Sequence, residues 1–249
     1  MKISYKTLFV ALCLMLMTMA FVWAAPTAPD TISKKSDQRV STTPAYTVQA
    51  LAGNVTLMNI DARTITRFWQ GYYGNVTGTI VLGDADNFTM YQWAMASPQG
   101  EIYAIHNTTA TINWTNLGCI VNETLVQEEI WLGTNQSGAD EDDINYTFDR
   151  YDHPSFYVGP LRFQNCRSTS VNSTGDSTIF WETLLMDNGT NVSTVTDDVV
   201  IYTGIISQDT TGFDARTHDF QLLVAEPGSG AESWPYGTIT NYYFYVELE

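Results

Sequence analysis

The sequence predicts an all-β protein, an antiparallel β-sandwich of Ig-like or jelly-roll-like type. Short segments in which apolar and polar residues alternate recur along the chain, and clusters of Gly, Asn, Asp and Pro separate them. In addition, many Asn-x-Ser/Thr triplets carry an apolar residue at the middle position. On a strand, the asparagine and the Ser/Thr share one face and the middle residue points to the other face. Such triplets are expected to place polar groups in solvent and apolar residues in a core.

The N-terminus has the features of an export signal. Lys2 and Lys6 precede an apolar run over 8–24 that only Thr18 interrupts, and small residues and Pro26 follow it. We predict that residues 1–24 are a signal peptide cleaved after Ala24. A retained membrane anchor is the alternative, because the run is at the low edge of what spans a bilayer. The protein is therefore expected to be secreted or to lie on the extracellular cell surface.

The rest of the chain is expected to form a leader and a glycosylated domain. Residues 25–45 are polar and rich in proline, which predicts a flexible leader or a donor segment. Residues 46–249 are expected to form the β-sandwich, as one domain or two packed subdomains. The stretch 39–50 carries β-favouring residues beside Pro44, so it is either a plain linker, a strand of its own subunit, or an edge strand added to the next subunit.

The stretch 61–82 changes its hydrophobic period at the glycines Gly71 and Gly74. Before them, apolar residues at helical spacing predict one short helix near residues 61–71, although an all-strand interpretation of 63–69 remains open because of the β-branched threonines. After them, Val76, Ile80 and Leu82 alternate with polar residues and predict a strand with one buried face.

Further strands are expected along the remaining chain. Two are centred on glycan triplets, with Ile112 and Trp114 in one, and Ile144, Tyr146 and Phe148 in the other, facing inward. The other predicted strands are 101–106, 129–132, 156–163 with a break at Gly159-Pro160, 179–186, 199–206, 220–224 and 242–248.

Eleven of the fifteen asparagines begin a glycan acceptor triplet, far more than random placement of 48 Ser and Thr residues would give. This enrichment agrees with export and predicts N-linked glycans. The candidate acceptors are Asn54, Asn75, Asn87, Asn107, Asn113, Asn122, Asn135, Asn145, Asn172, Asn188 and Asn191.

The charge pattern excludes several classes of partner. The formal net charge is −16, and no lysine follows Lys35. Nucleic acids and anionic membranes are bound through basic surfaces, so neither is an expected partner, and no membrane contact is expected unless the N-terminal segment is retained.

The two cysteines beyond the signal peptide, Cys119 and Cys166, are expected to form a disulfide, because an exported chain folds in an oxidising compartment. A zinc site is not expected without further ligands at metal spacing. The best metal candidate is the acidic run 140–143, in which Asp140, Asp142 and Asp143 would bind calcium; a solvated loop is the alternative. No other cofactor is expected.

Catalytic patterns are absent from the sequence. Its three histidines have no paired spacing, and there is no nucleophile elbow or phosphate-binding loop, so no enzyme activity is expected. Trp69, Trp114, Trp131 and Trp181 lie in apolar patterns typical of a core, whereas Trp234 beside Pro235 is the tryptophan most open to a ligand.

Four stretches carry a resemblance to known proteins: WQGYYGNVT at 69–77, TGFD at 211–214, DFQ at 219–221 and YFYVE at 243–247. In these the chain resembles uncharacterised exported β-rich surface glycoproteins of archaea. The resemblance implies a surface location and assigns no functional residue. We therefore expect a structural or adhesive cell-surface protein that associates with itself, as a filament or surface-layer subunit, or with other surface proteins. The alternative is an extracellular carbohydrate-binding module.

Overall fold

The computed structural model describes residues 25–40, 47–62, 65–66, 68–106, 112–134, 142–172, 177–188, 199–227 and 240–249. Within these ranges the chain is built from antiparallel sheets and two short helices. The prediction of an antiparallel all-β fold is confirmed, and the sandwich arrangement stays a prediction.

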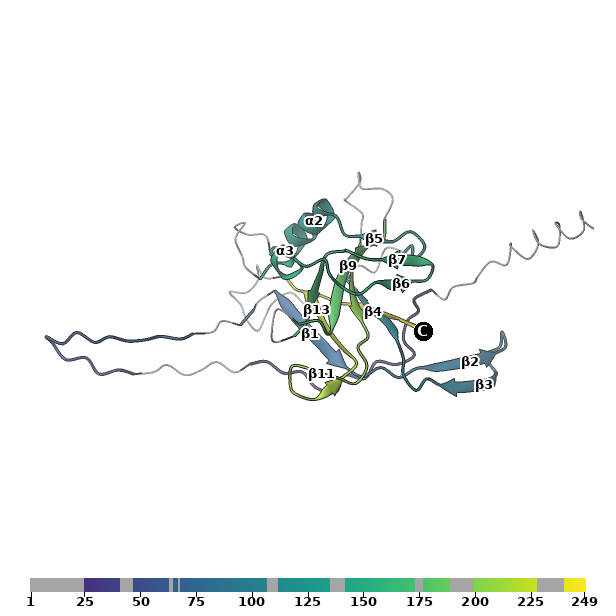
Figure 1. Cartoon of the computed structure of the whole chain (residues 1–249), viewed down its shortest axis with the longest axis horizontal. Coiled ribbons are helices and arrows are strands. Elements are labelled where there is room, and N and C mark those ends of the chain that lie inside the picture. The colour runs from purple at the N-terminus through teal and green to yellow at the C-terminus, as the bar shows by residue number, and fades with distance from the viewer. Residues whose placement is uncertain are drawn as a thin grey trace, which may run out of the picture.

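A six-stranded antiparallel sheet forms the centre of the body (Figure 1). Its strand order is β14-β4-β10-β9-β5, and β8 also pairs with β9. The strands are β4 (Gly100–Ile105), β5 (Gly118–Cys119), β8 (Ser168–Ser170), β9 (Trp181–Met186), β10 (Val200–Ile205) and β14 (Tyr243–Leu248).

Both faces of this sheet are buried. Every residue of β4 and β9 is buried, and successive side chains enter two different core clusters. Leu184 belongs to one cluster and Leu185 to the other, because neighbouring residues of a strand point to opposite faces. The near-continuous apolar sequence of β9 and β10 is what a strand covered on both sides requires.

A two-stranded ribbon and two helices cover the first face. The ribbon pairs β1 (Trp69–Gly74) with β13 (Phe220–Ala225), and its residues enter one core cluster with those of α2 (Asn122–Leu132) and α3 (Ile144–Thr147). The second face is covered by the hairpin of β6 (Phe156–Val158) and β7 (Leu161–Phe163), together with Leu117.

The helix predicted near residues 61–71 is wrong. Trp69–Gly74 is a strand in continuous register with β13, and none of the described residues between 61 and 68 is helical. The local apolar stripe was consistent with a helix, but pairing with a segment about 150 residues away in the chain decided the outcome. Such long-range pairing is not visible in local periodicity.

The two helices lie where strands were predicted. Residues 129–132 are the end of α2, and Ile144, Tyr146 and Phe148 lie in or beside α3. Asp143 begins α3 by accepting a hydrogen bond from the Tyr146 backbone N–H at 2.8 Å. Ile144 and Phe148, four residues apart, are both buried, whereas Tyr146 is exposed, so the predicted inward orientation of Tyr146 is also wrong.

The remaining predicted strands are confirmed by position. An observed strand lies in each of six further predicted ranges: 101–106, 156–163, 179–186, 199–206, 220–224 and 242–248. Ile112 and Trp114 are half-buried against the second core cluster, but they lie in no strand. A small hairpin of β11 (Thr210–Thr211) and β12 (Thr217–His218) completes the body. In the ranges that the structure describes, no helix is long and apolar enough to cross a membrane.

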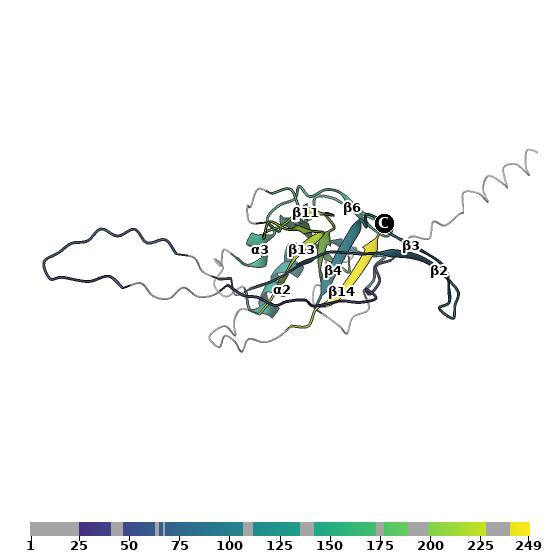
Figure 2. The ribbon, with the colours of Figure 1, turned by 90° about the horizontal axis from the view of Figure 1, so that it is seen from below.

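Two segments extend away from the body. One is the hairpin of β2 (Thr79–Gly83) and β3 (Thr89–Ala94), and the other is a long extended loop that includes residues 47–60 (Figures 1 and 2). The strand predicted from residue 75 onward is thus present as β2, but its predicted burial is wrong: Ile80 and Leu82 are exposed.

Candidate assembly surface and glycan acceptors

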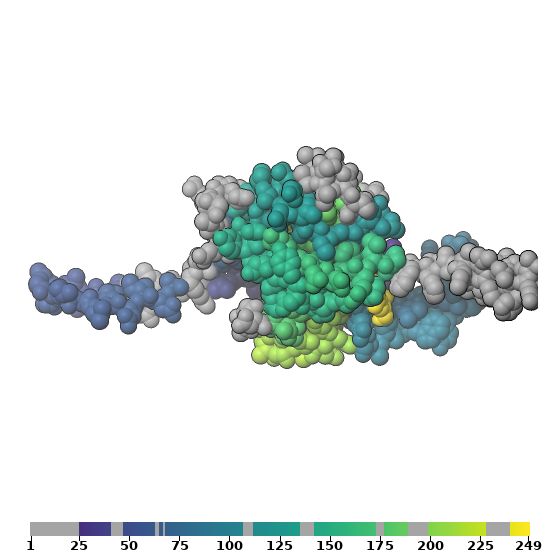
Figure 3. All heavy atoms as spheres, turned by 45° about the horizontal axis from the view of Figure 1, so that its top comes forward, coloured from purple at the N-terminus to yellow at the C-terminus, as the bar shows by residue number. Residues whose placement is uncertain are grey.

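The two extensions leave the body at opposite ends. We call residues 47–60 the projecting arm and residues 79–94, which form β2, β3 and their turn, the projecting hairpin. In both ribbon views they point in opposite directions from the central sheet (Figures 1 and 2), and the space-filling view shows them as separate protrusions on either side of the body (Figure 3). Neither is covered by the described part of the chain.

The projecting arm is extended, apolar and unpaired. Its tip is a turn in which the Asn54 N–H donates to the Leu51 carbonyl oxygen at 3.2 Å, and Gly53 takes a positive φ of 88°. A glycine at this third position is typical of a type II turn, since other residues are strained there. Beyond the turn, Val55 and Leu57 are 101% and 94% exposed. No described strand pairs with residues 47–60.

The projecting hairpin has a turn closed by one carboxylate. Asp84 Oδ1 accepts hydrogen bonds from the backbone N–H groups of Asp86 and Phe88, at 3.0 and 2.9 Å. Asn87 adopts a positive φ of 65° in this turn, a conformation that asparagine tolerates better than most residues. The sequence therefore specifies the hairpin locally.

One face of the projecting hairpin is apolar. Ile80 lies opposite Trp93, and Leu82 lies opposite Tyr91, so these four side chains share one face. The rings of Tyr91 and Trp93 are 4.0 Å apart between centroids, yet Trp93 remains 47% exposed. A two-stranded hairpin with an exposed apolar face has little stability in water by itself. A partner on this face would bury it.

The base of the hairpin lies close against the end of β14. The Met95 N–H donates to the Gly78 carbonyl oxygen at 2.9 Å. A Cβ atom at Gly78 would lie 2.5 Å from Leu248 Cδ1 and 2.9 Å from Met95 Sδ. The hairpin thus leaves the body at a point where only glycine fits without rearrangement.

The segments that flank the arm are also anchored. Thr27 exchanges two backbone hydrogen bonds with Val246 on β14, at 3.0 and 2.8 Å. Beyond the arm, the Thr66 hydroxyl donates to Asp142 Oδ2 at 2.7 Å, and the Trp69 indole donates to the Asp142 carbonyl oxygen at 2.6 Å. The chain after the arm is therefore held against α3, and Thr27 holds an earlier segment against β14.

The predicted calcium ligands are only partly brought together. Asp142 holds the base of the arm, and Asp143 is buried and caps α3. Asp140 lies outside the described residues. No group of three or more His, Cys, Asp or Glu side chains suited to a metal ion occurs in the described part of the chain. Calcium binding at the acidic run stays a prediction.

The predicted glycan acceptors differ in exposure. Asn107, Asn135 and Asn191 lie outside the described residues, and Asn172 and Asn188 are half-buried. The exposed acceptors are Asn54, Asn75, Asn87, Asn113, Asn122 and Asn145. In the triplets at Asn75 and Asn113 the two polar residues are exposed and the middle residue is half-buried, as predicted from the alternation.

Three acceptors have distinctive positions. Asn54 and Asn87 lie in the turns at the tips of the arm and the hairpin. At Asn122 the triplet lies at the start of α2, and its Thr124 is buried with the hydroxyl directed to the Met186 sulfur. The folded chain thus presents the Asn54 and Asn87 triplets openly and covers part of the Asn122 triplet.

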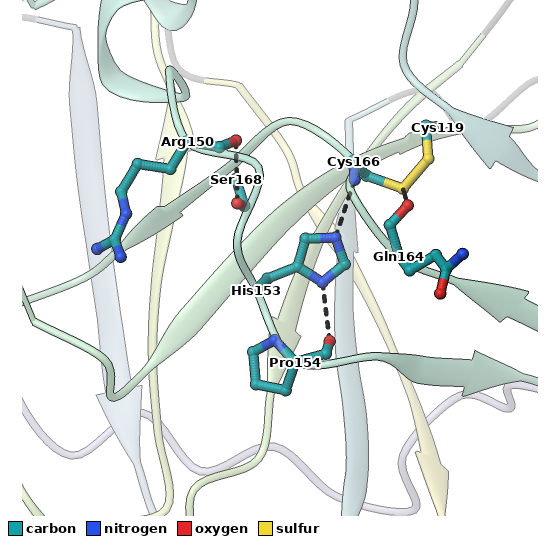
Figure 4. The surroundings of a disulfide bond; sticks show 7 residues. All are labelled: Cys119, Arg150, His153, Pro154, Gln164, Cys166 and Ser168. Atoms are coloured by element: carbon teal, nitrogen blue, oxygen red, sulfur yellow. Dashed lines mark hydrogen bonds between the residues drawn. A yellow bond between two sulfur atoms is a disulfide. The ribbon is translucent and has the colours of Figure 1, made fainter.

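The predicted disulfide is confirmed. Cys119 on β5 and Cys166 are joined, with their Cα atoms 5.1 Å apart. His153 supports this region: its Nδ1–H donates to the Pro154 carbonyl oxygen at 2.8 Å, and its Nε2 accepts the Cys166 N–H at 2.9 Å (Figure 4). Both nitrogens of a neutral ring are thus used, and burial lowers the pKa of His153. Sequence analysis had no role for this histidine, because its partners are backbone groups.

A pair of buried carboxyls was not predicted. Glu101 on β4 lies directly opposite Glu247 on β14, and both are almost fully buried. The Tyr103 hydroxyl donates to Glu247 Oε2 at 3.2 Å, and the Gly159 N–H donates to its Oε1 at 2.9 Å. Burial, together with the charges of Glu249 and Glu247, raises the pKa of Glu101 to about 9. In the sequence of β14, Glu247 alternates with the apolar Val246 and Leu248, which is typical of a solvent-facing residue; the cover provided by the β6–β7 hairpin is not visible in that strand.

One tryptophan departs from its predicted position. Trp131 is 60% exposed on α2 and stacks on His106, with ring centroids 4.4 Å apart. The His106 Nε2 atom lies 2.8 Å from Glu128 Oε1. Trp181 is buried as predicted, Trp69 and Trp114 are half-buried, and Trp234 lies outside the described residues.

Comparisons with protein-family models, curated proteins and solved structures found no match to this chain. The function of the chain must therefore be inferred from its own geometry. That geometry defines an antiparallel β protein with one covered body and two exposed apolar projections.

Proposed function

We propose that this protein is an exported, N-glycosylated structural or adhesive component of the cell exterior that assembles with copies of itself, as a filament or surface-layer subunit. The observation that carries this proposal is the presence of two apolar β-type projections at opposite ends of one body (Figure 1). A subunit with different contact surfaces at its two ends forms open chains unless its rotation closes a ring.

The energetics support association. Moving one large apolar side chain from water into an apolar contact contributes roughly 1.5–3 kcal/mol. The arm exposes six large hydrophobic side chains and the hairpin seven: Val48, Leu51, Val55, Leu57, Met58 and Ile60, and Ile80, Val81, Leu82, Phe88, Met90, Tyr91 and Trp93. Exposed apolar surface of this extent is typical of interaction sites.

The chemistry of the chain supports an extracellular role. The disulfide between Cys119 and Cys166 suits an oxidising compartment. Six acceptor asparagines are exposed within the described ranges, and glycans on them would keep the body soluble despite the low content of charged residues. Both properties are consistent with an exported assembly.

A carbohydrate-binding module is the second candidate, and Trp131 favours it. Its exposed indole lies on a polar cluster with His106 and Glu128, and flat aromatic faces beside polar groups suit sugar rings. The projections have no role in this second function, so the two candidates predict different behaviour.

The state of the purified, glycosylated protein tests the proposal. Sedimentation and electron microscopy over a concentration series should reveal polymers or sheets that grow with concentration. A chain that stays monomeric throughout contradicts the proposal. Retention of such a monomer on a polysaccharide column, lost in Trp131→Ala, would instead support the binding module.

A further inference from the structure

We propose that the projecting arm of one subunit docks on the projecting hairpin of the next subunit and adds a strand to it. The partner is thus a second copy of this chain, and the contact is head-to-tail. This inference rests on the proposed self-assembly and specifies the two surfaces that carry it.

The backbones of the two segments are suited to pairing. In the projecting hairpin β2 and β3 pair only with each other, so each has one outer edge that no described strand covers. The arm is extended, and its one backbone hydrogen bond to another described residue closes the turn at Leu51 and Asn54. Exposed edges and extended segments combine by strand addition.

The lengths of the two segments also agree. β3 has six residues, and the segment from Val55 to Ile60 beyond the arm's turn has the same length. At a rise of about 3.3 Å per residue, each spans about 20 Å. An added strand can therefore pair along the whole of β3, with no residue of either six-residue segment left without a backbone partner.

The side chains match the apolar face of the hairpin. In a strand formed by the arm, Val55 and Leu57 share one face, and Met58 and Ile60 share the other. Whichever face lies beside Tyr91 and Trp93 therefore extends the apolar surface of the hairpin. Large hydrophobic residues on both faces are typical of a strand that is covered on both sides.

Charge favours contact between these two segments over contact between bodies. The chain has a formal net charge of −16, so two copies repel each other in general. Residues 47–60 contain no charged side chain, and the projecting hairpin contains only Asp84 and Asp86, both in its turn. The arm–hairpin contact thus brings together the surfaces with the least repulsion.

The geometry of the chain disfavours the same contact within one molecule. The arm and the hairpin extend in opposite directions from the body (Figures 1 and 2). Gly78 at the base of the hairpin lies close against Leu248, and Asp142 accepts a hydrogen bond from Thr66 in the chain after the arm. An arm from a neighbouring copy meets the hairpin without moving either base.

Two defective subunits provide the test. The arm variant carries Val55→Asp and Leu57→Asp, and the hairpin variant carries Leu82→Asp and Trp93→Asp. All four side chains are exposed, so the body should keep its fold, which thermal unfolding of each variant would verify. Each variant alone should be monomeric under conditions in which the parent chain polymerises. An equimolar mixture should form 1:1 dimers and nothing larger, because only one intact arm and one intact hairpin can meet.

A matched control and four contradicting outcomes make the test decisive. Ile130→Asp changes an exposed hydrophobic residue on α2 and should polymerise like the parent. A monomeric parent would overturn the proposed self-assembly itself. If the parent polymerises, an arm variant that also polymerises would overturn only the arm–hairpin pairing. A hairpin variant that dimerises alone through its arms would likewise overturn only this pairing. A mixture that stays monomeric would do the same.

Discussion

Similar apolar residues are buried in the body and exposed in the two projections. In the body, alternating and continuous apolar segments are buried on both faces of the sheet, and Leu184 and Ile201 have no exposed surface. In the projections, residues of the same types are exposed, and Val55 and Leu57 are almost completely so. An apolar strand pattern therefore identifies a surface that needs a cover, but it does not show whether that cover belongs to the same subunit.

Removing the disulfide should have the largest of the predicted effects: it should destabilise the body and leave assembly through the projections intact. Cys119 and Cys166 are separated by 47 residues within the body, and closing such a loop stabilises the folded state by about 4 kcal/mol through the unfolded chain. Replacing both cysteines by serine should lower the free energy of unfolding by that amount in denaturant titrations. At denaturant concentrations below its unfolding midpoint the variant is folded, and it should still polymerise, because neither projection contains a cysteine. A loss below 1 kcal/mol would show that the loop is already constrained by other contacts.

The same Leu→Ala substitution should change the free energy of unfolding strongly in the body and hardly at all in the arm. Leu184→Ala removes a completely buried side chain from the centre of the sheet and should destabilise the body by about 3 kcal/mol. Leu57→Ala in the arm should change the free energy of unfolding of the monomer by less than about 0.5 kcal/mol, since its side chain is in water. Chemical denaturation at a concentration below assembly measures both. Equal effects would mean that the arm packs on its own body.

Local patterns predicted most strands of the body but missed both helices. The strands over 101–106, 199–206 and 220–224 were found because their apolar residues are flanked by turn residues. In α2, the run of Glu, Gln and Leu residues favours a helix, and Gly133 ends it in a left-handed conformation at φ 68°. That signal was available, but 129–132 was assigned to a strand, and the glycan triplet at Asn145 suggested another strand where α3 lies. A triplet's spacing indicates a strand only where the flanking residues also favour one.

The candidate site could be predicted only in part. The acceptor triplets and the cysteine pair are identified from residue types alone; the two cysteines are joined in the structure, and glycosylation stays a prediction. The apolar character of 47–60 and 79–94 was also visible, yet their exposure was not, because exposure depends on which segments fold over them. Likewise, Asp142 was chosen as a metal ligand for its acidic neighbours, whereas its observed contacts are with Thr66 and Trp69, more than seventy residues earlier in the chain.

A further effect concerns charge inside the body, where Glu101 lies opposite Glu247 of β14 and near the charge of Glu249, the residue after that strand. Burial raises the pKa of Glu101 from 4.5 to about 9. Between these values the folded chain keeps a proton that the unfolded chain has released, so the free energy of unfolding falls as the pH rises. The free energy of unfolding should fall by about 2 kcal/mol between pH 6 and pH 8. This loss is below the limit of about 1.4 kcal/mol for each of the two pH units.

Glu101→Gln removes this titration and should therefore reduce the difference in stability between pH 6 and pH 8 by about 2 kcal/mol relative to the parent chain. The contribution of His153 is common to both chains and cancels in the comparison. Glu123→Gln, an exposed carboxyl on α2, is the matched control and should keep the parent's pH dependence. Thermal unfolding at the two pH values measures the effect at concentrations below assembly, where the projections contribute nothing. If Glu101→Gln keeps the parent's pH dependence, water reaches this carboxyl, and the contrast between a dry body and wet projections is weaker than the burial of Glu101 implies.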